Sequence, residues 1–347
     1  MSRNIAIIGD FFMLPEIFDH ELRQACAGVE LTTRLMQNDW PNSPVVHGYG
    51  GDQEVKIKEF IGDFDEVVDF IGEAELLVMH QSPITAEMLD RLPNLRFIGC
   101  SRGGPINVDI EAARARGVSV VRAPGRNASA VAEFTIGAML VETRKIRVGH
   151  EALRKGDWRG DLYRADTTGR ELNEMTVGVI GYGNIGSRVT RLLRAFGAKV
   201  LVHDPYVQLF PVDQADGVAM VCLEDLLTQS DVVTLHPRVS PETTHMINKE
   251  TLAQMKPDAL LINTARGPLC NYDDLYAGLR DGVLGSAMLE TFSVEPVPVD
   301  WPLLQLENVT LTPHIAGASA RTVTYAAQTL AEDVRRYFAD EPLLNAY

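Results

Sequence analysis

One segment limits what this chain can fold into: the glycine-rich run GYGNIG at residues 181–186. It follows an apolar stretch at 177–180 that predicts a buried strand, and it opens a stretch at 185–196 that predicts a helix. In such a turn the first glycine permits a tight bend, the second lets a pyrophosphate approach the backbone, and the third lets helix and strand pack closely. The helix N-terminus adds N–H groups and partial positive charge for the phosphates. The segment therefore predicts a parallel α/β sheet that binds a dinucleotide through Gly181, Gly183, Asn184, Ile185 and Gly186.

An acidic residue follows the next predicted strand, where a dinucleotide site requires one. That strand covers 199–203, and Asp204 comes directly after it, eighteen residues beyond Gly186. A carboxylate in this place accepts hydrogen bonds from the ribose hydroxyls and repels a 2′-phosphate, which favours NAD over NADP. A glycine turn without a ligand, or the loop of a methyltransferase, would share part of this pattern, but neither needs the residues described next.

The chain alternates short apolar strands with amphipathic helices in two stretches, which predicts two parallel-sheet α/β domains. The first stretch predicts strands at 4–8, 31–36, 76–79, 95–100 and 118–121, helices at 15–25, 64–71 and 109–116, and a loop at 39–52. One helix over 129–150 and a surface connection at 156–170 follow. The second stretch predicts strands at 177–180, 199–203, 232–235, 259–262, 286–289 and 309–311, and helices at 185–196, 223–229, 249–255, 273–281 and 320–338.

Length and composition exclude several classes of protein. A chain of 347 residues predicts about two domains, and 32 basic against 47 acidic residues give a net charge of −15, which disfavours nucleic-acid binding. The four cysteines form no CxxC pair, which argues against a metal site and favours a reducing cytoplasm. No apolar run approaches the length of a membrane span. We therefore expect a cytoplasmic protein with a small-molecule substrate, no metal, and no nucleic-acid or membrane partner.

Three late segments place charged or titratable residues after successive predicted strands. They are Arg266-Gly267, Glu295-Pro296, and the run TPH that ends at His314. Because ligands of an open α/β sheet bind at the carboxyl ends of its strands, these residues are expected at one edge.

With these segments the chain resembles the D-isomer-specific 2-hydroxyacid dehydrogenase family, nearest to its phosphoglycerate dehydrogenase-like branch. The likeness covers roughly residues 76–338. Further motifs that match are LH at 235–236, PET at 241–243, APGRN at 123–127 and VAE at 131–133. The resemblance implies two Rossmann-like or flavodoxin-like parallel-sheet domains with a cleft between them. It implies a discontinuous substrate-binding domain of residues 1–122 and 321–347, a NAD-binding Rossmann domain of residues 123–320, and a homodimer.

The chemistry of the implied reaction explains the three residue types. Arg266 offers a charged, planar fork for a substrate carboxylate. His314 can give a proton to the developing alkoxide, and Glu295 can hold its other ring nitrogen. Oxidation of formate or phosphite has no use for such a pair, so Glu295 favours a hydroxy acid. Further residues implied at the cofactor are His236, Pro237, Thr243, Thr264, Ala265, Arg266, Glu290, His314 and Gly317.

One or two of His80, Arg102 and Arg126 could be surface residues that offset the acidic charge of the chain. If at least one of them points inward, the implied substrate site contains more positive and hydrogen-bonding groups than a small keto acid can use. Its candidates are His80, Arg102, Gly103, Gly104, Arg126 and Arg266. We therefore expect a polyhydroxylated or phosphorylated acid, with sugar acids slightly ahead of 3-phosphoglycerate. The sequence departs from the family at Glu290, where an Asp is usual, and at Arg238, where a Pro is usual. An alternative function is a NAD(H)-sensing binding protein of the corepressor type.

Overall fold

The computed structural model describes residues 3–40 and 56–347, which divide into two compact units. Unit 1 comprises Met1–Asn127 and Ala318–Tyr347, and unit 2 comprises Ala128–Gly317. Unit 1 is therefore discontinuous in sequence. The unit boundaries lie a few residues from the domain boundaries that the resemblance implies, which fall after residues 122 and 320. Most of the loop expected at 39–52 lies outside the described residues.

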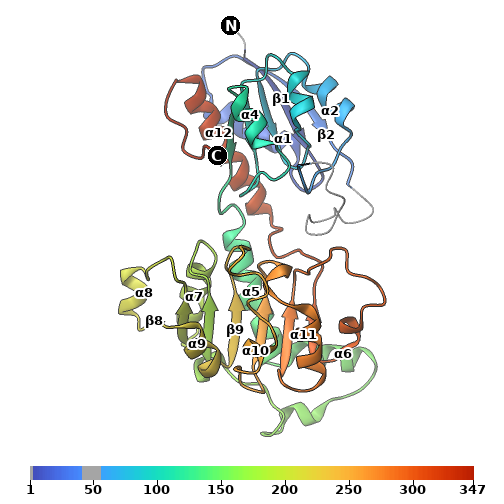
Figure 1. Ribbon diagram of the computed structural model, residues 1–347, viewed down its shortest axis with the longest axis vertical. Helices are drawn as coiled ribbons and strands as arrows, with labels where there is room; N and C mark the ends of the chain where they lie inside the picture. The colour runs from blue at the N-terminus through green and yellow to red at the C-terminus, as the bar shows by residue number, and fades with distance from the viewer. Residues whose placement is uncertain (1–2, 41–55) are drawn as a thin grey trace. The chain divides into compact units, whose positions relative to one another are not determined.

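Unit 1 is built on a five-stranded parallel sheet with the order β2-β1-β3-β4-β5, the flavodoxin-like order (Figure 1). Its strands are β1 (Arg3–Gly9), β2 (Leu31–Gln37), β3 (Leu76–Met79), β4 (Phe97–Cys100) and β5 (Ser119–Arg122). Its helices are α1 (Pro15–Ala25), α2 (Phe64–Ile71), α3 (Ala86–Asp90), α4 (Ile110–Ala115) and α12 (Ala320–Phe338). Alternate residues of β1 point to opposite faces: Ile5 packs with α1 and α12, whereas Ile8 packs with α2, α3 and α4. Helices therefore cover both faces of the sheet.

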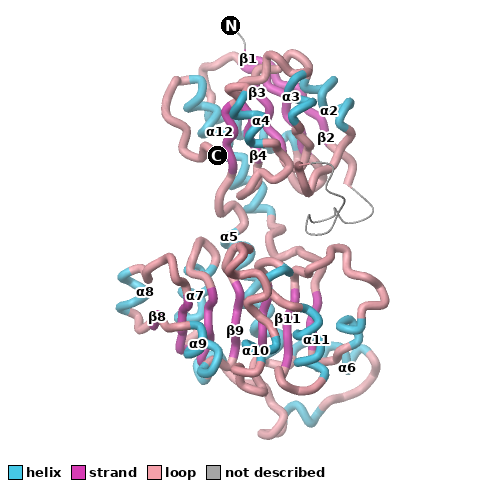
Figure 2. Tube along the Cα trace, in the orientation of Figure 1, coloured by secondary structure: helices cyan, strands magenta, loops and turns pink. Residues whose placement is uncertain are grey.

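Unit 2 is built on a seven-stranded parallel sheet with the order β12-β11-β10-β9-β6-β7-β8 (Figure 2). Its strands are β6 (Thr176–Ile180), β7 (Lys199–His203), β8 (Ala219–Met220), β9 (Val232–Leu235), β10 (Leu260–Asn263), β11 (Ser286–Leu289) and β12 (Val309–Leu311). Its α-helices are α5 (Ala128–Thr143), α6 (Ile146–Arg154), α7 (Gly186–Ala195), α8 (Pro211–Ala215), α9 (Leu223–Gln229), α10 (Lys249–Leu252) and α11 (Tyr272–Arg280). Four short 3-10 turns are η1 (Gly160–Tyr163), η2 (Leu172–Glu174), η3 (Gly267–Leu269) and η4 (Pro302–Gln305).

The two faces of the unit 2 sheet are also covered. Residues of α5 and α7 pack on one face, and residues of α9, α10 and α11 pack on the other. The strand order reverses at β6, which pairs with both β7 and β9. That reversal is the switch point at which open α/β sheets bind their ligands.

The single helix expected over 129–150 is wrong, because the structure breaks it into α5 and α6. Lys145, between the two helices, has a φ of 58°. The carbonyl of Thr143 accepts a hydrogen bond from the N–H of Arg170, at 3.1 Å, instead of continuing the helix. A Cβ on Gly169 would lie 2.3 Å from that same carbonyl oxygen, so only glycine lets the later segment approach so closely. The sequence also failed to predict the short elements α3, α8 and β8.

No helix in the described ranges is both long enough and apolar enough to cross a bilayer.

Candidate active site

The strands of unit 2 end in register, and this alignment brings the predicted residues to one edge of the sheet. The last residues of six strands pair with their neighbours in an unbroken row: His203, Ile180, Leu235, Asn263, Leu289 and Leu311. The predicted cofactor and catalytic residues of unit 2 lie in the loops that follow these residues. The sheet therefore assembles this part of the site from segments that are far apart in sequence.

The three glycines of the 181–186 loop have three different surroundings. Gly181 has a φ of +89°, and a Cβ there would lie 2.6 Å from the backbone nitrogen of Pro237. A Cβ on Gly186 would lie 1.9 Å from the carbonyl oxygen of Gly181, where α7 begins against β6. A Cβ on Gly183 would meet nothing within 4 Å. Two glycines thus close the turn, whereas Gly183 keeps its backbone open for a ligand.

Asp204 is fixed against this loop by backbone N–H groups. One carboxylate oxygen accepts from Tyr182 N–H at 2.7 Å, and the other accepts from Tyr206 N–H at 2.9 Å and Val207 N–H at 3.2 Å. A carboxylate has about four lone-pair sites, so three N–H donors still leave acceptor capacity. The side chain is therefore held in place with room for ribose hydroxyls.

His236 lies on the other side of the loop, after β9. Its Nε2 lies 3.0 Å from the hydroxyl of Thr234, and burial lowers its pKa to about 3, so the ring is neutral. Its Nδ1 is buried and has no hydrogen-bond partner in the described part of the chain. Thr243 closes the neighbouring turn, since its hydroxyl donates to the carbonyl of Arg238 at 2.7 Å. An unpaired buried ring nitrogen beside a glycine loop is an atom that a bound ligand could satisfy.

Arg266 lies on a tight turn after β10. The side chain of Asn263 braces this turn by donating to Arg266 O at 3.0 Å and accepting from Ala265 N–H at 3.1 Å. A Cβ on Gly267 would lie 2.0 Å from the backbone of Phe292, so the glycine lets this turn lie against the segment after β11. The Arg266 side chain is exposed, and one of its N–H groups donates to Ala265 O at 2.7 Å. Thr264 is buried and lies 2.9 Å, hydroxyl to hydroxyl, from Thr135 on α5.

His314 and Glu295 form the pair that the sequence predicted. Nδ1 of His314 lies 2.8 Å from Oε2 of Glu295, and Oε1 of Glu295 accepts from Phe292 N–H at 2.7 Å. The Glu295 side chain is 8% exposed and the His314 side chain 27% exposed. The carboxylate is therefore buried and held at both oxygens, while the imidazole keeps access to solvent. Because Glu295 engages Nδ1, Nε2 is the nitrogen that can pass a proton to a ligand.

Glu290 lies beside the His314–Glu295 pair. Its Oε1 accepts from Ala316 N–H at 2.9 Å, and its carbonyl accepts from His314 N–H at 3.1 Å. Burial raises the pKa of Glu290 to about 7, and Glu295 raises it further, although His314 and the bond from Ala316 act against the rise. Glu290 thus braces the turn that carries His314 and Gly317.

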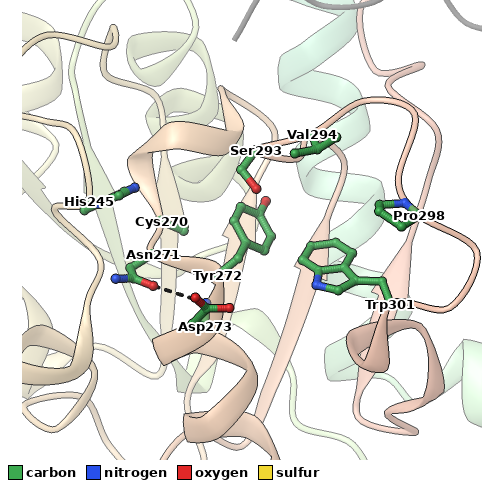
Figure 3. Close-up of a pocket in the computed structure, with 9 residues that line it drawn as sticks. All are labelled: His245, Cys270, Asn271, Tyr272, Asp273, Ser293, Val294, Pro298 and Trp301. Carbon is green, nitrogen blue, oxygen red and sulfur yellow. Dashed lines mark hydrogen bonds between the residues drawn. The ribbon is translucent and has the colours of Figure 1, made fainter. Parts of the chain in front are cut away.

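An aromatic cluster supports the segment that leads to Glu295 (Figure 3). The ring of Tyr272 lies 5.2 Å from that of Trp301, which lies 6.0 Å from that of Phe292. The Tyr272 hydroxyl donates to the carbonyl of Thr291. Beside these rings is a hollow of about 290 Å³, which contains none of the predicted catalytic residues. It is lined by His245, Cys270, Asn271, Tyr272, Asp273, Ser293, Val294, Pro298 and Trp301.

Unit 1 contains a second imidazole–carboxylate pair, which the sequence analysis missed. Nδ1 of His80 lies 2.6 Å from Oδ2 of Asp10, and Nε2 of His80 lies 3.4 Å from Nη2 of Arg126. Asp10 and His80 follow β1 and β3, which are neighbours in the sheet. Both follow strand ends in the sequence, so the signal was present, but only the strand order brings them together.

Arg102 has a different environment from Arg126. Its guanidinium pairs with the carboxylate of Glu59 and donates to the carbonyl of Glu59 at 3.2 Å. The pair is largely buried, with side chains 12% and 9% exposed. The backbone N–H groups of Gly103 and Gly104 have no acceptor among residues 3–40 and 56–347. Of the predicted substrate residues in unit 1, Gly103 and Gly104 offer these two N–H groups, and Arg126 offers a buried Nη1 that has no partner among the described residues.

The residues present fit a nicotinamide dinucleotide. Gly183 is open, Asp204 is oriented, and the buried Nδ1 of His236 and hydroxyls of Thr291 and Thr312 have no partner in the described segments. Unpartnered buried polar atoms at the strand ends of an α/β sheet are typical of a polar ligand site. No group of three or more His, Cys, Asp or Glu side chains suited to a metal ion occurs within the described ranges.

Comparisons with known proteins identify the family of the chain. Residues 136–316 match the family model described as the NAD binding domain of D-isomer specific 2-hydroxyacid dehydrogenases. The chain is 35% identical over 300 residues to a D-3-phosphoglycerate dehydrogenase of Methanocaldococcus jannaschii, covering 83% of this chain and 56% of that protein. It is 34% identical over 269 residues to a glyoxylate reductase of Korarchaeum cryptofilum, covering 77% of this chain and 81% of that protein. The chain thus spans about half the length of the phosphoglycerate dehydrogenases that it matches.

Solved structures share the fold over nearly the whole chain. The TT0316 protein of Thermus thermophilus is 29% identical and matches with a TM-score of 0.77, covering 98% of this chain and 99% of that one.

Proposed function

Because the chain belongs to the D-isomer-specific 2-hydroxyacid dehydrogenase family, we propose that it interconverts a D-2-hydroxy acid and its 2-keto acid with NAD. The observation that carries this proposal is the His314–Glu295 pair, which unit 2 places at the same sheet edge as the 181–186 loop. A hydride transfer that also moves a proton needs such a pair. The names of the relatives, phosphoglycerate dehydrogenase and glyoxylate reductase, support the same reaction class.

The side chains of unit 2 divide the work of the reaction. Arg266 would hold the substrate carboxylate through its exposed guanidinium. In reduction, Nε2 of His314 would give a proton to the carbonyl oxygen, and Glu295 would stabilise the imidazolium through Nδ1. Gly183, Asp204 and His236 would hold the dinucleotide, which when bound supplies or accepts the hydride. The bracing of Glu295 by Phe292 N–H keeps the carboxylate from turning away.

The proposed substrate is a polyhydroxylated or phosphorylated acid of about four or more carbons, with sugar acids ahead of 3-phosphoglycerate. Arg126 supports it, because its buried Nη1 would cost about 1–3 kcal/mol if a smaller substrate left it unpaired. His80 supports it through its contact with Arg126, and the N–H groups of Gly103 and Gly104 offer two further donors. Arg102 gives the least support to this substrate class, because its guanidinium already forms an ion pair with the carboxylate of Glu59.

The test is a panel of 2-keto acids and sugar acids assayed with NADH and with NADPH. We expect turnover of polar, larger keto acids, and a fall in turnover when His314 is replaced. Binding of NADH without turnover of any acid would favour the sensing alternative instead. If glyoxylate or pyruvate were the best substrate, the proposed substrate class would be wrong.

The cofactor preference gives a second test of the same site. Asp204→Ala removes the carboxylate that would repel a 2′-phosphate, so the preference for NADH over NADPH should fall by about 10-fold to 100-fold. The measurement is the ratio of kcat/KM for the two cofactors in the variant and in the unaltered protein. Glu224→Ala, on the exposed side of α9, is a matched loss of one carboxylate and should leave the ratio unchanged. Equal efficiency with both cofactors in the unaltered protein would refute the role of Asp204.

We also infer a cytoplasmic homodimer that assembles through unit 2. Helix α6 buries none of its residues, and the segment around it exposes four large apolar side chains: Ile146, Leu153, Trp158 and Tyr163. Several exposed large apolar side chains in one segment are typical of a protein interface. The four free thiols support a reducing compartment. Sedimentation of Leu153→Glu and Trp158→Glu should show a monomer where the unaltered protein is a dimer.

A further inference from the structure

We propose that Asp10, His80 and Arg126 form an anion-binding site in unit 1, where Arg126 takes a second anionic group of the substrate, a carboxylate or a phosphate. This inference rests on the dehydrogenase function proposed above and narrows its substrate class to acids with a second anionic group, which ranks phosphorylated or dicarboxylic acids above sugar acids whose other groups are neutral. It makes Asp10 and His80 positioning residues, which act on the substrate through Arg126.

The first step of the argument is that the Asp10–His80 pair is rigid and buried. Asp10 is 1% exposed and His80 3% exposed. Asp10 Oδ1 accepts from Phe12 N–H at 2.9 Å and from Met13 N–H at 2.8 Å, which leaves Oδ2 for Nδ1 of His80. The carbonyl of His80 accepts from Asn107 at 3.0 Å, which fixes the backbone of the same residue. Neither side chain can leave the pair without losing buried hydrogen bonds.

The second step is the protonation of this pair. Burial is the largest influence on His80 and lowers its pKa to about 4, aided by Arg126 and Arg102 and opposed by Asp10. Burial opposes ionisation of Asp10, but the hydrogen bonds from His80, Met13 and Phe12 lower its pKa overall. At neutral pH the pair is therefore a carboxylate and a neutral imidazole. With its proton on Nδ1 toward Asp10, the imidazole presents Nε2 as an acceptor to Arg126.

The third step is that Arg126 has donors without acceptors. Its Nη2 faces Nε2 of His80 at 3.4 Å, and its guanidinium carbon lies 5.9 Å from the centre of the Phe12 ring. Its Nη1 is buried and has no partner in the described parts of the chain. Burial lowers the pKa of Arg126 to about 10, so the group stays charged at neutral pH. A buried, charged N–H without an acceptor is costly unless a ligand oxygen satisfies it.

The chemistry of the ligand follows from the guanidinium. Its planar fork matches the paired oxygens of a carboxylate or a phosphate. The contrast with Arg102 supports this choice, because Arg102 has a carboxylate partner in Glu59. Among the described residues, the polar and ring contacts of the Arg126 guanidinium are a neutral imidazole nitrogen and an aromatic ring. The hydroxyl of Ser101 is also buried without a partner in the described segments.

The test compares 2-keto acids that differ only in the second group. Oxaloacetate is paired with 2-ketobutyrate, and 3-phosphohydroxypyruvate with hydroxypyruvate, and the measured quantity is the charged-to-neutral ratio of kcat/KM. We expect a ratio well above 1 in the unaltered protein, and the larger of the two ratios shows whether carboxylate or phosphate is the preferred group. Arg126→Gln should lower that ratio about 10-fold to 100-fold, mainly through KM, and Arg126→Lys should keep part of it. Arg91→Gln, which removes an exposed cation paired with Asp65, should leave the ratio unchanged.

Asp10→Asn tests the positioning role separately. With the amide oxygen on the two backbone N–H groups, the amide nitrogen would donate to Nδ1 of His80. The imidazole proton would then move to Nε2 and face the N–H of Arg126. We expect a several-fold fall in the charged-to-neutral ratio, together with a change of tautomer in the ¹⁵N spectrum of His80. Since each ratio is taken within one preparation, a smaller folded fraction does not alter it.

The outcomes separate this inference from the proposed function. Turnover of neutral keto acids, with a ratio near 1 that Arg126→Gln does not change, would overturn the anion site alone. Absence of turnover with every acid would overturn the dehydrogenase function. In that case, inorganic phosphate is titrated against the imidazole signals of His80. Saturable shifts that Arg126→Gln abolishes would support the site, and equal shifts in both proteins would overturn it.

Discussion

The two units each hold a histidine against a carboxylate, and the two pairs differ in what surrounds them. In both pairs Nδ1 contacts the carboxylate, at 2.8 Å for His314–Glu295 and 2.6 Å for His80–Asp10. The His314 side chain is 27% exposed, whereas that of His80 is 4% exposed. One further titratable group lies beside each pair. In unit 2 it is the carboxyl group of Glu290, and in unit 1 it is the guanidinium of Arg126.

This difference in exposure and in neighbouring groups indicates different roles for the two pairs. An imidazole that passes protons needs access to a ligand, and neighbouring carboxylates stabilise its charged form. An imidazole that is buried beside a guanidinium stays neutral and acts as a fixed acceptor. In the roles proposed above, the same two residue types make a proton donor in unit 2 and a positioning pair in unit 1.

The largest expected effect comes from removing the two imidazoles in turn. His314→Ala should lower kcat about 100-fold to 10,000-fold, because the proton donor is lost, while binding of NADH stays nearly unchanged. His80→Ala should change kcat on a neutral keto acid by less than about 10-fold, because no proton passes through it. Steady-state kinetics and NADH fluorescence titration measure both.

His20→Ala, an exposed histidine on α1, is the control and should behave as the unaltered protein. The different roles argued for the two histidines would be wrong if His314→Ala kept near-normal turnover. They would also be wrong if His80→Ala lowered kcat on the neutral keto acid as much as His314→Ala does.

The sequence predicted one pair and missed the other, for a physical reason. Glu295 and His314 each follow a strand within a specific motif, so the residue types alone identify them. Asp10 and His80 also follow strands, but their contact depends on the pairing of β1 with β3, which places Ile8 beside Met79. Strand order in a parallel sheet is set by crossover connections and not by local pattern. Residues such as Glu59, Tyr272 and Trp301 were missed likewise, since each acts through contacts between distant segments.

Element positions were predictable where the pattern was local. The strands at 76–79 and 199–203 and the helices at 15–25 and 320–338 have the predicted bounds, because buried apolar runs and amphipathic periods define them. The helix break between α5 and α6 was not predictable from its own residues. It depends on Gly169 and Arg170, which approach Thr143 from a later part of the chain.

The pH dependence of stability gives a second comparison of the two units, through Glu290 in unit 2 and Asp10 in unit 1. The pKa of Glu290 is about 7 in the folded protein and near 4.5 when unfolded, so the folded state holds its proton more tightly. Below pH 4.5, Glu290 therefore contributes on the order of 3 kcal/mol to the free energy of unfolding, and this contribution is lost as the pH rises through 7. Asp10 behaves oppositely, since its lowered pKa gives stability that is lost on acidification.

Glu290→Gln should therefore remove part of the fall in stability between about pH 5 and pH 7. The measurement is the thermal midpoint of the variant and of the unaltered protein across that range. Glu250→Gln, an exposed carboxyl on α10, is the control. Parallel curves for Glu290→Gln and the unaltered protein would show that Glu290 titrates as an ordinary carboxyl.

The smallest expected effect, and the most direct comparison, comes from neutralising the carboxylate of each pair. Glu295→Gln removes the negative partner of the His314 imidazolium, so reduction should slow by about 10-fold and its pH range should move toward lower pH. Asp10→Asn should leave the pH range unmoved on a neutral keto acid, because His80 holds no exchangeable proton for the reaction. Full pH profiles of kcat/KM for both variants on one substrate decide between these roles. If Asp10→Asn moves the profile as far as Glu295→Gln does, both pairs handle protons, and the division of tasks argued from burial is wrong.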